Sequence, residues 1–289
     1  MHAQLFTRER QCIGEIRLAT PSDYPAMLEA FAAIAAWSHQ KVGSDVPVGV
    51  GVAGVVSPSS GILLSANHPA SGKSLGRDLN RIFDRPVSLL NDAHAFAMAE
   101  ATMGAGQGFD AVAAVIVGTG IGGGFVVNGR LRQGPAHTTY EFGHTALPAT
   151  LVAAHGLPLV ACPCGRTGCM ETLLSGPGLV RLSEALIGHA MTPSEVIESR
   201  QGRAIQVWSV WCALMAELLH QIVIYLDPDV IVLGGGLGQR DELLPDLATT
   251  LNTATLRGFG SPLLRSGRLG AGAGALGAAC AALSPVAEV

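Results

Sequence analysis

Short Val-rich segments alternate with amphipathic segments along most of the chain, and this alternation is the feature that most restricts the fold. Residues Tyr24–Gln40 carry apolar side chains at intervals of three or four, which predicts an amphipathic helix. The next apolar run, Val46–Gly54, is bounded by turn-forming residues and predicts a buried strand. A helix that leads into a buried strand is typical of α/β proteins.

The same alternation continues through the rest of the sequence. It predicts helices and strands in turn at Lys73–Phe83, Val87–Leu90, Ala93–Met103, Ala111–Val117, Ala204–Tyr225 and Val230–Leu233, with a further helix after Gln239. A Gly-rich connector, Gly104–Phe109, indicates a domain boundary. We therefore expect a two-lobed α/β protein with a ligand cleft. Its smaller N-terminal lobe is residues 1–107 with the C-terminal helix 275–289 packed on it, and its larger lobe is residues 108–274.

Composition excludes several classes of protein. Charged residues make up 14% of the chain and the formal net charge is -4, so no polybasic surface for nucleic acid is expected. Two uncharged stretches, Ala111–Val127 and Leu269–Pro285, contain several glycines and are shorter than the roughly 18 to 20 apolar residues of a spanning helix. The N-terminus lacks the pattern of a secretory signal. We expect a cytoplasmic protein that does not bind a membrane.

Three of the six cysteines lie close together and predict a metal site: Cys162, Cys164 and Cys169. Gly and Pro separate them, so the thiols can converge on one tetrahedral cation, and a structural zinc ion fits this pattern better than unliganded thiols do. An imidazole would complete the set. His144 is a candidate, and His137 and His155 are also near in sequence.

Two glycine clusters follow predicted strands. Gly118–Gly124 can direct backbone N–H groups at phosphate oxygens, although a plain glycine-rich hairpin is the alternative. It is neither a Rossmann fingerprint nor a Walker loop. The pair Asn128-Gly129 then predicts a hairpin turn. The second cluster, Gly234–Gly236, closes the strand Val230–Leu233 and is weak evidence by itself.

Carboxylates occur at three positions of interest. Asp92 follows a strand and precedes a helix, where it is either an N-cap or a general base toward a substrate hydroxyl. Glu141 and Glu171 flank the cysteine cluster, and a loop made rigid by a bound metal ion would fix the two carboxylates around a polyol. As isolated residues, each would more often be a solvated surface charge.

Together, four segments resemble motifs of the ROK family of bacterial sugar kinases and repressors, within the sugar-kinase/actin-like (ribonuclease H-like) superfamily. They are the Glu-x-Gly-His segment Glu141–His144, the Cys-x-Cys-Gly-x-x-Gly-Cys-x-Glu segment Cys162–Glu171, the pair Asn91-Asp92, and the glycine loop Gly118–Gly124. The resemblance extends over nearly the whole chain.

The resemblance implies a role for each segment. Asp92 is the catalytic base. Sugar hydroxyls are held by Asn91, Asp92, Glu141, His144 and Glu171. Zinc is bound by His144, Cys162, Cys164 and Cys169. ATP, which brings Mg²⁺ with it, lies along Gly118, Thr119, Gly120, Gly122, Gly234, Gly235 and Gly236. A homodimer is expected, because dimers are common in the family.

The loop Ser65–Leu75 indicates the substrate. It is similar to the Ala-Asn-x-Pro-x-x-Ser-Gly-Lys-x-Leu loop of the family's N-acetylglucosamine kinases, in which Asn67, Ser71 and Gly72 would seat the N-acetyl group and nearby hydroxyls. We therefore predict ATP-dependent phosphorylation of N-acetyl-D-glucosamine at the 6-hydroxyl. Fructose, glucose and N-acetylmannosamine remain alternatives, since fructokinases of the family have a similar Leu226–Gly236 segment.

One family motif is absent from the sequence. The family begins with a strand that carries Asp-x-Gly-Gly-Thr and contacts the ATP phosphates, whereas Ala3–Glu9 resembles the strand after it. The chain as written is therefore expected to hold ATP poorly, either because its start was assigned too late or because it is a sugar-binding pseudokinase. A repressor would carry an additional helix-turn-helix, for which there is no room before Leu5.

Overall fold

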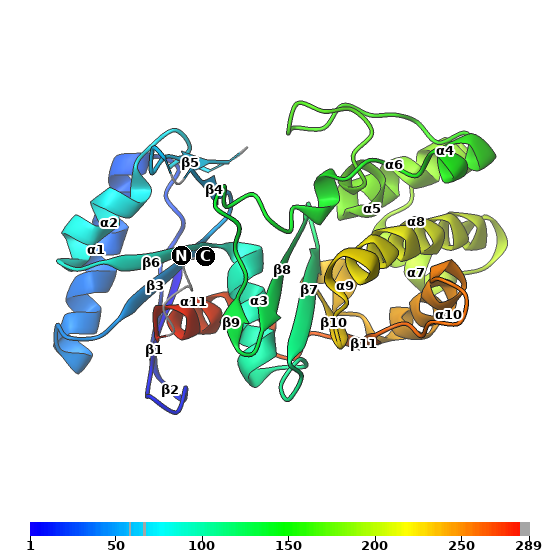
Figure 1. Cartoon of the computed structure of the whole chain (residues 1–289). Coiled ribbons are helices and arrows are strands. Elements are labelled where there is room, and N and C mark those ends of the chain that lie inside the picture. Colours follow the sequence, from blue (N-terminus) through cyan, green and yellow to red (C-terminus); the bar gives the residue numbers. More distant parts are fainter. Residues whose placement is uncertain (58, 66–67, 284–289) are drawn as a thin grey trace. The chain divides into compact units, whose positions relative to one another are not determined.

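The structure, a computed structural model, describes residues 1–57, 59–65 and 68–283. The chain forms two compact units (Figure 1). The first consists of Met1–Gly104, Val126–Thr139 and Leu269–Val289, and the second of Ala105–Phe125 and Tyr140–Arg268. The chain first passes between them inside the predicted connector Gly104–Phe109. The domain limits expected from the sequence, 1–107 and 108–274, remain a proposal.

The first unit combines short sheets with helices. Its elements are β1 (His2–Phe6), β2 (Cys12–Arg17), α1 (Tyr24–Val42), β3 (Val48–Val52), β4 (Val55–Val56), β5 (Leu63–Leu64), α2 (Leu75–Phe83), β6 (Val87–Asn91), α3 (Asp92–Met103), β9 (Arg130–Leu131), η3 (Gly270–Gly272) and α11 (Ala273–Leu283).

Apart from β9, the strands of the first unit pair two by two. β1 pairs with β2 and β4 pairs with β5, both antiparallel, whereas β3 pairs with β6 in parallel. In the parallel pair, Val52 lies opposite Asn91, so both strands end at the same edge. α11 packs against α3 and β3. The glycines at these contacts are required, since a Cβ atom on Gly49 or Gly277 would collide with the backbone of Ala278 or Ala95, respectively.

The core of the first unit lies beneath α1 and α2. Met27 of α1 and Leu75 and Leu79 of α2 are almost fully buried and pack in one cluster with Val52 and Leu63. Such burial of apolar side chains is the main force that fixes helices on strands. It holds β3 in place and thereby places the edge at which Val52 and Asn91 end.

The second unit is built around a larger sheet. Its elements are β7 (Ala111–Val117), β8 (Ile121–Val127, whose last two residues belong to the first unit), η1 (Phe142–His144), α4 (Ala149–His155), α5 (Glu171–Leu174), α6 (Gly176–Ile187), α7 (Pro193–Ser199), α8 (Gly202–Leu226), β10 (Val230–Gly234), α9 (Gly235–Gly238), η2 (Asp241–Leu243), α10 (Leu244–Ala254) and β11 (Leu263–Ser266).

The sheet order is β11-β10-β7-β8-β9, and β10 is parallel to both of its neighbours. All five residues of β10 are buried, as expected for a central strand of a parallel sheet. Gly234 pairs with Ile116, so the strand ends that carry the two glycine clusters lie at one edge of the sheet. The fold therefore brings the second glycine cluster close to the first.

Helix α8 forms much of the core of the second unit. Trp211 is almost fully buried and its indole N–H donates to the carbonyl oxygen of Leu174 at 3.0 Å. Among the described residues, α8 is the helix long and apolar enough to cross a membrane, but most of its apolar stretch is buried inside the protein. A buried core helix passes the same test of length and composition.

Most of the predicted elements are present. Tyr24–Val42, Leu75–Phe83, Asp92–Met103 and Gly202–Leu226 are helical, and Val48–Val52, Val87–Asn91, Ala111–Val117 and Val230–Gly234 are strands. The helix expected after Gln239 starts only at Leu244, because a 3₁₀ turn precedes it. The C-terminal helix, expected over 275–289, covers Ala273–Leu283, and residues 284–289 lie outside the described residues.

Candidate functional site

Asp92 is the first residue of α3, directly after β6. The N-cap role considered for Asp92 belongs mainly to Asn91, which has an extended backbone and whose Oδ1 accepts from the Ala93 N–H at 2.8 Å. The Asn91 side-chain amide also donates to the Gly54 carbonyl oxygen at 3.0 Å. Both ends of the Asn91 side chain therefore hold the β6–α3 turn.

Asp92 is accessible to solvent, and it lies at one end of a cavity where many protein atoms surround its carboxylate. This partial loss of water raises the pKa of the Asp92 carboxyl above its ordinary value, against the opposing effect of the Ala93 N–H, which donates to Oδ1 at 2.9 Å. A carboxylate with a raised pKa is a better proton acceptor than a fully solvated one. The position is therefore suitable for a general base.

The loop expected to select the sugar lies in the same unit as Asp92. His68 of this loop and Asp92 line the same cavity, and burial lowers the pKa of the His68 imidazole. The Ser71 hydroxyl donates to the carbonyl oxygen of Ser65 at 2.8 Å and accepts from the Ser65 N–H at 3.1 Å. Gly72 has φ +78°, which favours glycine. Asn67, the remaining predicted contact, lies outside the described residues.

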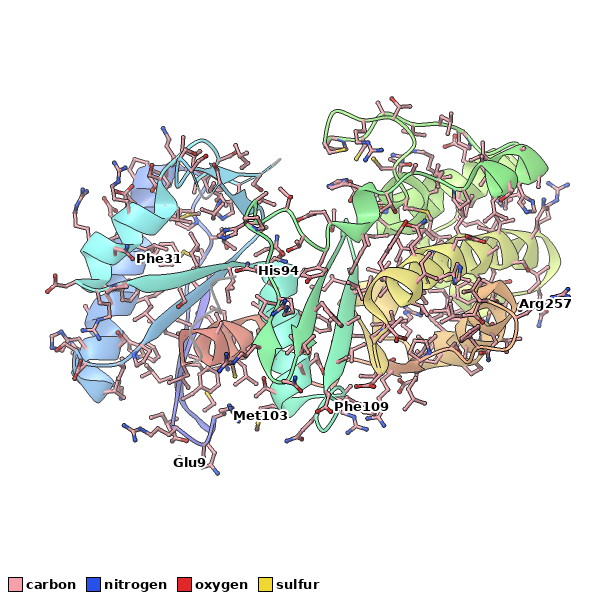
Figure 2. The ribbon with its side chains drawn as sticks, in the orientation of Figure 1. Glu9, Phe31, His94, Met103, Phe109 and Arg257 are labelled. Carbon is pink, nitrogen blue, oxygen red and sulfur yellow. The ribbon has the colours of Figure 1, made fainter. Side chains whose placement is uncertain are left out.

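A buried histidine that the sequence analysis did not identify follows Asp92 on α3. This residue, His94, is labelled in Figure 2. Its exposed fraction is 3%. Its Nε2 lies 3.2 Å from the Thr139 carbonyl oxygen and its Nδ1 lies 3.1 Å from the Gln133 amide nitrogen. These contacts tie the first turn of α3 to the segment Val126–Thr139 of the same unit. A lone histidine on an apolar helix face carries no sequence signal for such a role.

In the second unit, Glu141–His144 forms the residue before η1 and the helix itself. Gly143 packs so closely on β8 that no side chain fits between them, because a Cβ atom there would lie 2.5 Å from the Ile121 carbonyl oxygen. This close approach explains why the motif has glycine between its two polar residues. It sets η1 against the strand and directs His144 toward the cysteine cluster.

Glu171, the first residue of α5, connects two parts of the site. Its Oε1 accepts from the Cys162 thiol at 3.1 Å and lies 3.5 Å from Nδ1 of His144. Its Oε2 accepts from the Ile121 N–H at 3.3 Å, directly after the first glycine turn. The carboxylate of Glu141 lies 3.9 Å from the other nitrogen, Nε2, of the same imidazole. Two carboxylates and one imidazole are therefore gathered around the cysteine cluster.

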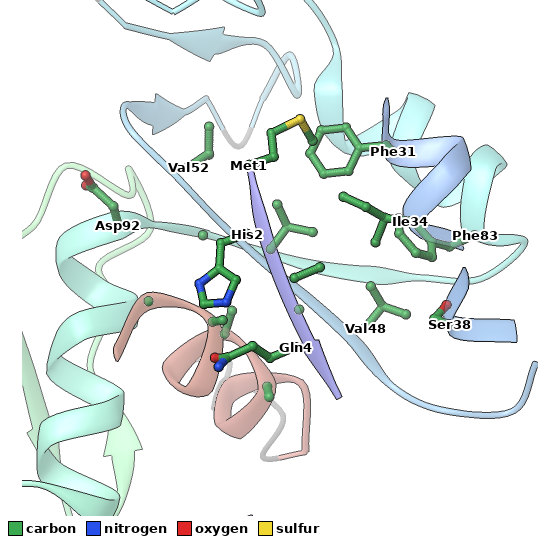
Figure 3. A pocket seen from close by; sticks show the side chains of 18 of the residues that line it. Met1, His2, Gln4, Phe31, Ile34, Ser38, Val48, Val52, Phe83 and Asp92 are labelled. Atoms are coloured by element: carbon green, nitrogen blue, oxygen red, sulfur yellow. The ribbon is translucent and has the colours of Figure 1, made fainter. Parts of the chain in front are cut away.

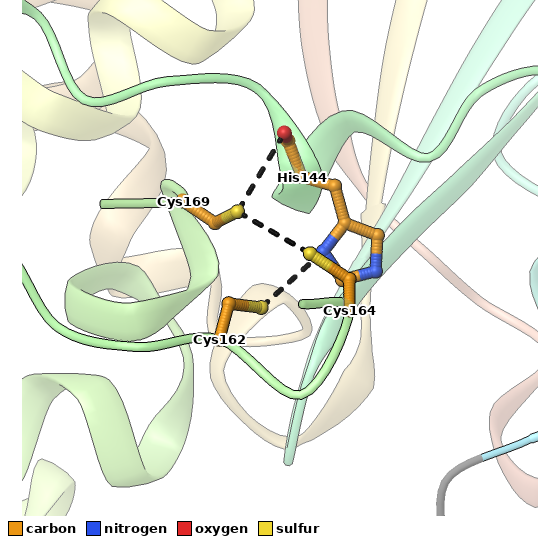
Figure 4. A group of neighbouring side chains, drawn as sticks. All are labelled: His144, Cys162, Cys164 and Cys169. Carbon is orange, nitrogen blue, oxygen red and sulfur yellow. Dashed lines mark hydrogen bonds between the residues drawn. The ribbon is translucent and has the colours of Figure 1, made fainter. Parts of the chain in front are cut away.

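The four residues predicted to bind metal form one group: His144, Cys162, Cys164 and Cys169 (Figure 4). Their ligand atoms all lie within 4.8 Å of one another. The Cys164 and Cys169 sulfur atoms are 3.6 Å apart, and Cys162 Sγ is 3.6 Å from His144 Nδ1. Zn–S bonds of about 2.3 Å in a tetrahedron would separate two sulfur atoms by roughly 3.8 Å. The donor set and its spacing therefore fit one tetrahedral cation.

The thiols differ in their surroundings. Burial raises the pKa of Cys162 and of Cys169, whereas the Arg166 backbone N–H lowers the pKa of the exposed Cys164. The Arg166 guanidinium also donates to the His144 carbonyl oxygen at 3.0 Å. Among the described residues, the group that could hold a metal ion includes His144 and neither His137 nor His155, the two other candidates. The structure therefore favours His144 as the fourth ligand.

Of the predicted phosphate loop Gly118–Gly124, only Gly118–Gly120 form the tight turn between β7 and β8, with the Gly118 N–H donating to the Gly120 carbonyl oxygen at 3.0 Å, and the remaining residues belong to β8. Gly235 has φ +80°, and a Cβ atom there would lie 2.5 Å from the Val117 carbonyl oxygen. A Cβ atom on Gly118 or Gly236 would meet no atom within 4 Å. Each cluster therefore has a glycine with open space beside its Cα atom, and both glycines lie at the same sheet edge.

Two further observations concern the ends of this loop. The Gly176 N–H donates to the Gly118 carbonyl oxygen at 2.7 Å, and Ser175 caps α6 through its hydroxyl, so the start of α6 supports the turn. Ser175-Gly176-Pro177 is a helix-start signal that sequence analysis can find, although its contact with Gly118 depends on tertiary structure. At the far end of β8, Asn128 and Gly129 have φ values of 51° and 72°, which confirms the predicted hairpin turn.

The predicted residues therefore fall into two sets. Asn91, Asp92, Ser71 and Gly72 belong to the first unit, and the metal group, the two glutamates and the glycine clusters belong to the second. Within the second unit, Glu171 connects the metal group to the glycine turn. That the two sets act on one substrate is part of the function proposed below.

Comparisons with known proteins agree with these motifs. The chain matches the ROK family over residues 1–284. It is 37% identical over 287 residues to the N-acetyl-D-glucosamine kinase of Escherichia fergusonii, covering 97% of this chain and 95% of that protein. It is 34% identical over 268 residues to an N-acetylgalactosamine kinase of Shewanella sp. strain ANA-3, covering 91% of this chain and 87% of that protein.

A solved structure extends the comparison to the fold. The ROK hexokinase of Thermus thermophilus superimposes with a TM-score of 0.81 at 30% identity, covering 93% of this chain and 90% of that one. The sugar-kinase type of α/β fold predicted from the motifs is thereby confirmed. The chain belongs to the ROK family.

Proposed function

We propose that the protein transfers the γ-phosphoryl group of ATP to the 6-hydroxyl of N-acetyl-D-glucosamine, forming N-acetylglucosamine 6-phosphate. The observation that carries the proposal is the position of Asp92, an accessible carboxylate of raised pKa at the end of a parallel strand. The 37% identity to an N-acetyl-D-glucosamine kinase along 95% of that protein supports the choice of sugar.

In this mechanism, Asp92 accepts the proton of the 6-hydroxyl while the oxygen attacks phosphorus. Its contribution is mainly positional and electrostatic, as in other phosphoryl transfers. Asn91, whose side-chain oxygen and nitrogen are both engaged with the backbone, fixes the turn from which Asp92 projects. Asn91 would then contact the sugar through the hydrogen-bond positions of its amide group that these two bonds do not use.

Glu141, His144 and Glu171 would hold sugar hydroxyls. Nε2 of His144 is free of the thiols and faces Glu141, while Nδ1 faces the cysteine cluster. One ring can therefore serve the metal through Nδ1 and a hydroxyl through Nε2. Ser71 shapes the loop through its two hydrogen bonds to Ser65, and the loop would seat the N-acetyl group together with Asn67 and Gly72.

The glycine clusters would bind ATP. The turn at Gly118–Gly120 and residue Gly122 of β8 would approach the phosphates, and Gly234–Gly236 would lie along the adenosine part. Small residues allow a nucleotide to approach the backbone. Mg²⁺ that accompanies ATP would neutralise charge on the phosphates.

Zinc, bound by the three thiolates and His144, would be structural, because four protein ligands leave no open position for water. It would lock η1 to the segment before α5 and thereby fix Glu171 and His144. A cytoplasmic location and a homodimer complete the proposal.

One observation favours a second sugar. The relative from Shewanella is an N-acetylgalactosamine kinase, and that sugar differs from N-acetylglucosamine only in the configuration of the 4-hydroxyl. A coupled ADP-release assay with Mg²⁺-ATP should compare these two sugars with N-acetylmannosamine, glucose and fructose. The proposal predicts the highest kcat/KM for N-acetylglucosamine. A higher value for N-acetylgalactosamine would overturn the substrate, and sugar binding without turnover would identify a pseudokinase.

A further inference from the structure

The buried His94 holds both ends of one loop, the segment Gln133–Thr139. A carbonyl oxygen only accepts hydrogen bonds, so Nε2 of His94, 3.2 Å from the Thr139 carbonyl oxygen, carries the ring proton. Nδ1 is then the acceptor for the Gln133 amide, 3.1 Å away. Burial lowers the pKa of the His94 imidazole, which favours this neutral form with one donor and one acceptor. The ring therefore matches the chemistry of both partners.

The backbone that follows the Thr139 carbonyl has a conformation that its side chains do not favour. Tyr140 has a φ of 68°, and His137 inside the loop has a φ of 54°. A bulky residue at positive φ is strained and persists where surrounding contacts hold it. His94 supplies such a contact, because its hydrogen bond fixes the plane of the peptide that joins Thr139 to Tyr140. Rotation of this peptide is the change that would release the strain at Tyr140.

Tyr140 leads directly into Glu141–His144, the motif expected to hold the sugar. Its ring packs against two other aromatic rings, with centroid distances of 6.2 Å to Phe125 and 5.9 Å to Phe142 of η1. A change in the φ of Tyr140 would move its ring out of these contacts and would turn the start of η1. The direction in which the motif begins therefore depends on the plane of the peptide before Tyr140.

We propose that His94 is a positioning residue of the predicted sugar site. Through the Thr139 carbonyl it holds the backbone turn at Tyr140 from which the motif Glu141–His144 starts. This proposal rests on the proposed function, in which that motif holds sugar hydroxyls. The helix that carries His94 begins with Asp92, whose side chain projects from the N-terminal end of α3 (Figure 3). The first turn of α3 therefore carries both the proposed base and the residue that holds the loop.

Steady-state kinetics of the complete chain with N-acetylglucosamine and Mg²⁺-ATP test the proposal. His94→Leu keeps a side chain of similar size but removes both polar contacts, so the KM for sugar should rise about tenfold, as expected for the loss of a buried hydrogen bond. The KM for ATP should change little, because the glycine clusters lie outside the loop. His94→Gln places a donor where Nε2 was and should recover most of the affinity. His39→Leu, at an exposed position of α1, is the matched control and should behave as the parent does.

Hydrogen exchange gives a readout that does not depend on turnover. The N–H groups of His144 and Thr145 donate to the Glu141 and Phe142 carbonyl oxygens at 3.0 and 3.2 Å. If His94 holds the start of η1, both amides should exchange faster in His94→Leu than in the parent, and His94→Gln should slow them again. The amides of the central strand β10 should exchange equally in all of these proteins.

Each outcome decides the proposal. An unchanged KM for sugar in His94→Leu, equal increases in the KM for sugar and for ATP, or no recovery in His94→Gln would overturn it. If His94→Leu does not fold, Gln133→Leu decides, because this half-buried residue can be changed while His94 stays in place, and a KM for sugar equal to that of the parent would then overturn the proposal. An inactive parent would contradict the proposed function instead, and unchanged exchange at His144 and Thr145 would then reject the role of His94.

Discussion

Replacing Gly143 with alanine tests whether the packing of η1 on β8 sets the geometry of the predicted sugar and metal residues. A Cβ atom at this position would lie 2.5 Å from the Ile121 carbonyl oxygen, 2.8 Å from Ile121 Cβ and 3.2 Å from Glu171 Cβ. None of these atoms is the free end of a flexible side chain, so the added methyl group must push η1 away from the strand.

The size of the effect follows from these contacts. Overpacking a tight interior contact costs typically about 1–3 kcal/mol. For a protein of this size, each 1 kcal/mol corresponds to a fall in Tm of roughly 2–4 °C. The displacement of η1 also moves His144 relative to Cys162, 3.6 Å away, and Glu141 with it. We therefore expect weaker metal retention and a higher KM for sugar, with a smaller change in the KM for ATP.

Differential scanning fluorimetry, metal analysis and steady-state kinetics measure these three effects. Gly260→Ala is the matched control, because a Cβ atom at Gly260 meets no atom within 4 Å and its φ is not positive. The control should behave as the parent does. If Gly143→Ala matched the parent in Tm, metal content and KM for sugar, the close packing of η1 on β8 would not control the site.

Three further results are expected. Cys164→Ser should lower metal content from about one ion per chain to much less and should raise the KM for sugar. The control Cys12→Ser, at an exposed position, should change neither quantity, and an active parent protein without metal would contradict the predicted role of the metal. The raised pKa of Asp92 means that the folded protein binds this proton more tightly than the unfolded chain does, so kcat/KM should fall with decreasing pH at an apparent pKa above 3.8. For the same reason, Asp92→Asn should raise Tm at neutral pH by an amount that shrinks toward acid pH. A Tm difference that grows toward acid pH would contradict the upward direction of the pKa shift. Tyr24→Phe removes a hydroxyl that donates to Asp78 at 2.7 Å and should lower the free energy of unfolding by about 1 kcal/mol in urea titrations. Tyr225→Phe, at a 78% exposed position, should have no effect, and equal stabilities of the two variants would show that the Tyr24 hydrogen bond does not stabilise the fold.

Local patterns predicted much of the fold because the relevant signals lie within short segments. The apolar spacing in Tyr24–Gln40 and the Val-rich run at Val46–Gly54 reflect helix and strand periodicity, which tertiary contacts did not override. Asn128-Gly129 specified its turn because both residues accept positive φ. The cysteine spacing likewise indicated that the three thiols would gather, as they do beside His144.

Other features depend on contacts between distant segments. Asn91 is the N-cap of α3 although the Asp92 carboxylate also accepts from the Ala93 N–H, since position 91 has the extended backbone of a cap and Asp92 is already the first helical residue. The bridging role of Glu171 depends on Cys162 and Ile121, and the burial of His94 depends on Gln133 and Thr139. No single segment encodes these partners, so periodicity and spacing do not reveal them.

The central claim is that Asp92 is the base for phosphorylation of N-acetylglucosamine. The most direct measurement compares kcat for Asp92→Asn with the parent at saturating sugar and Mg²⁺-ATP, with calorimetric titration of the sugar in parallel and Asp84→Asn, at an exposed left-handed position, as the control. The account predicts that sugar affinity is retained while kcat falls by about two to four orders of magnitude, and that the control keeps the parent rate. Turnover by Asp92→Asn within threefold of an active parent would contradict the claim and remove Asp92 from the chemistry.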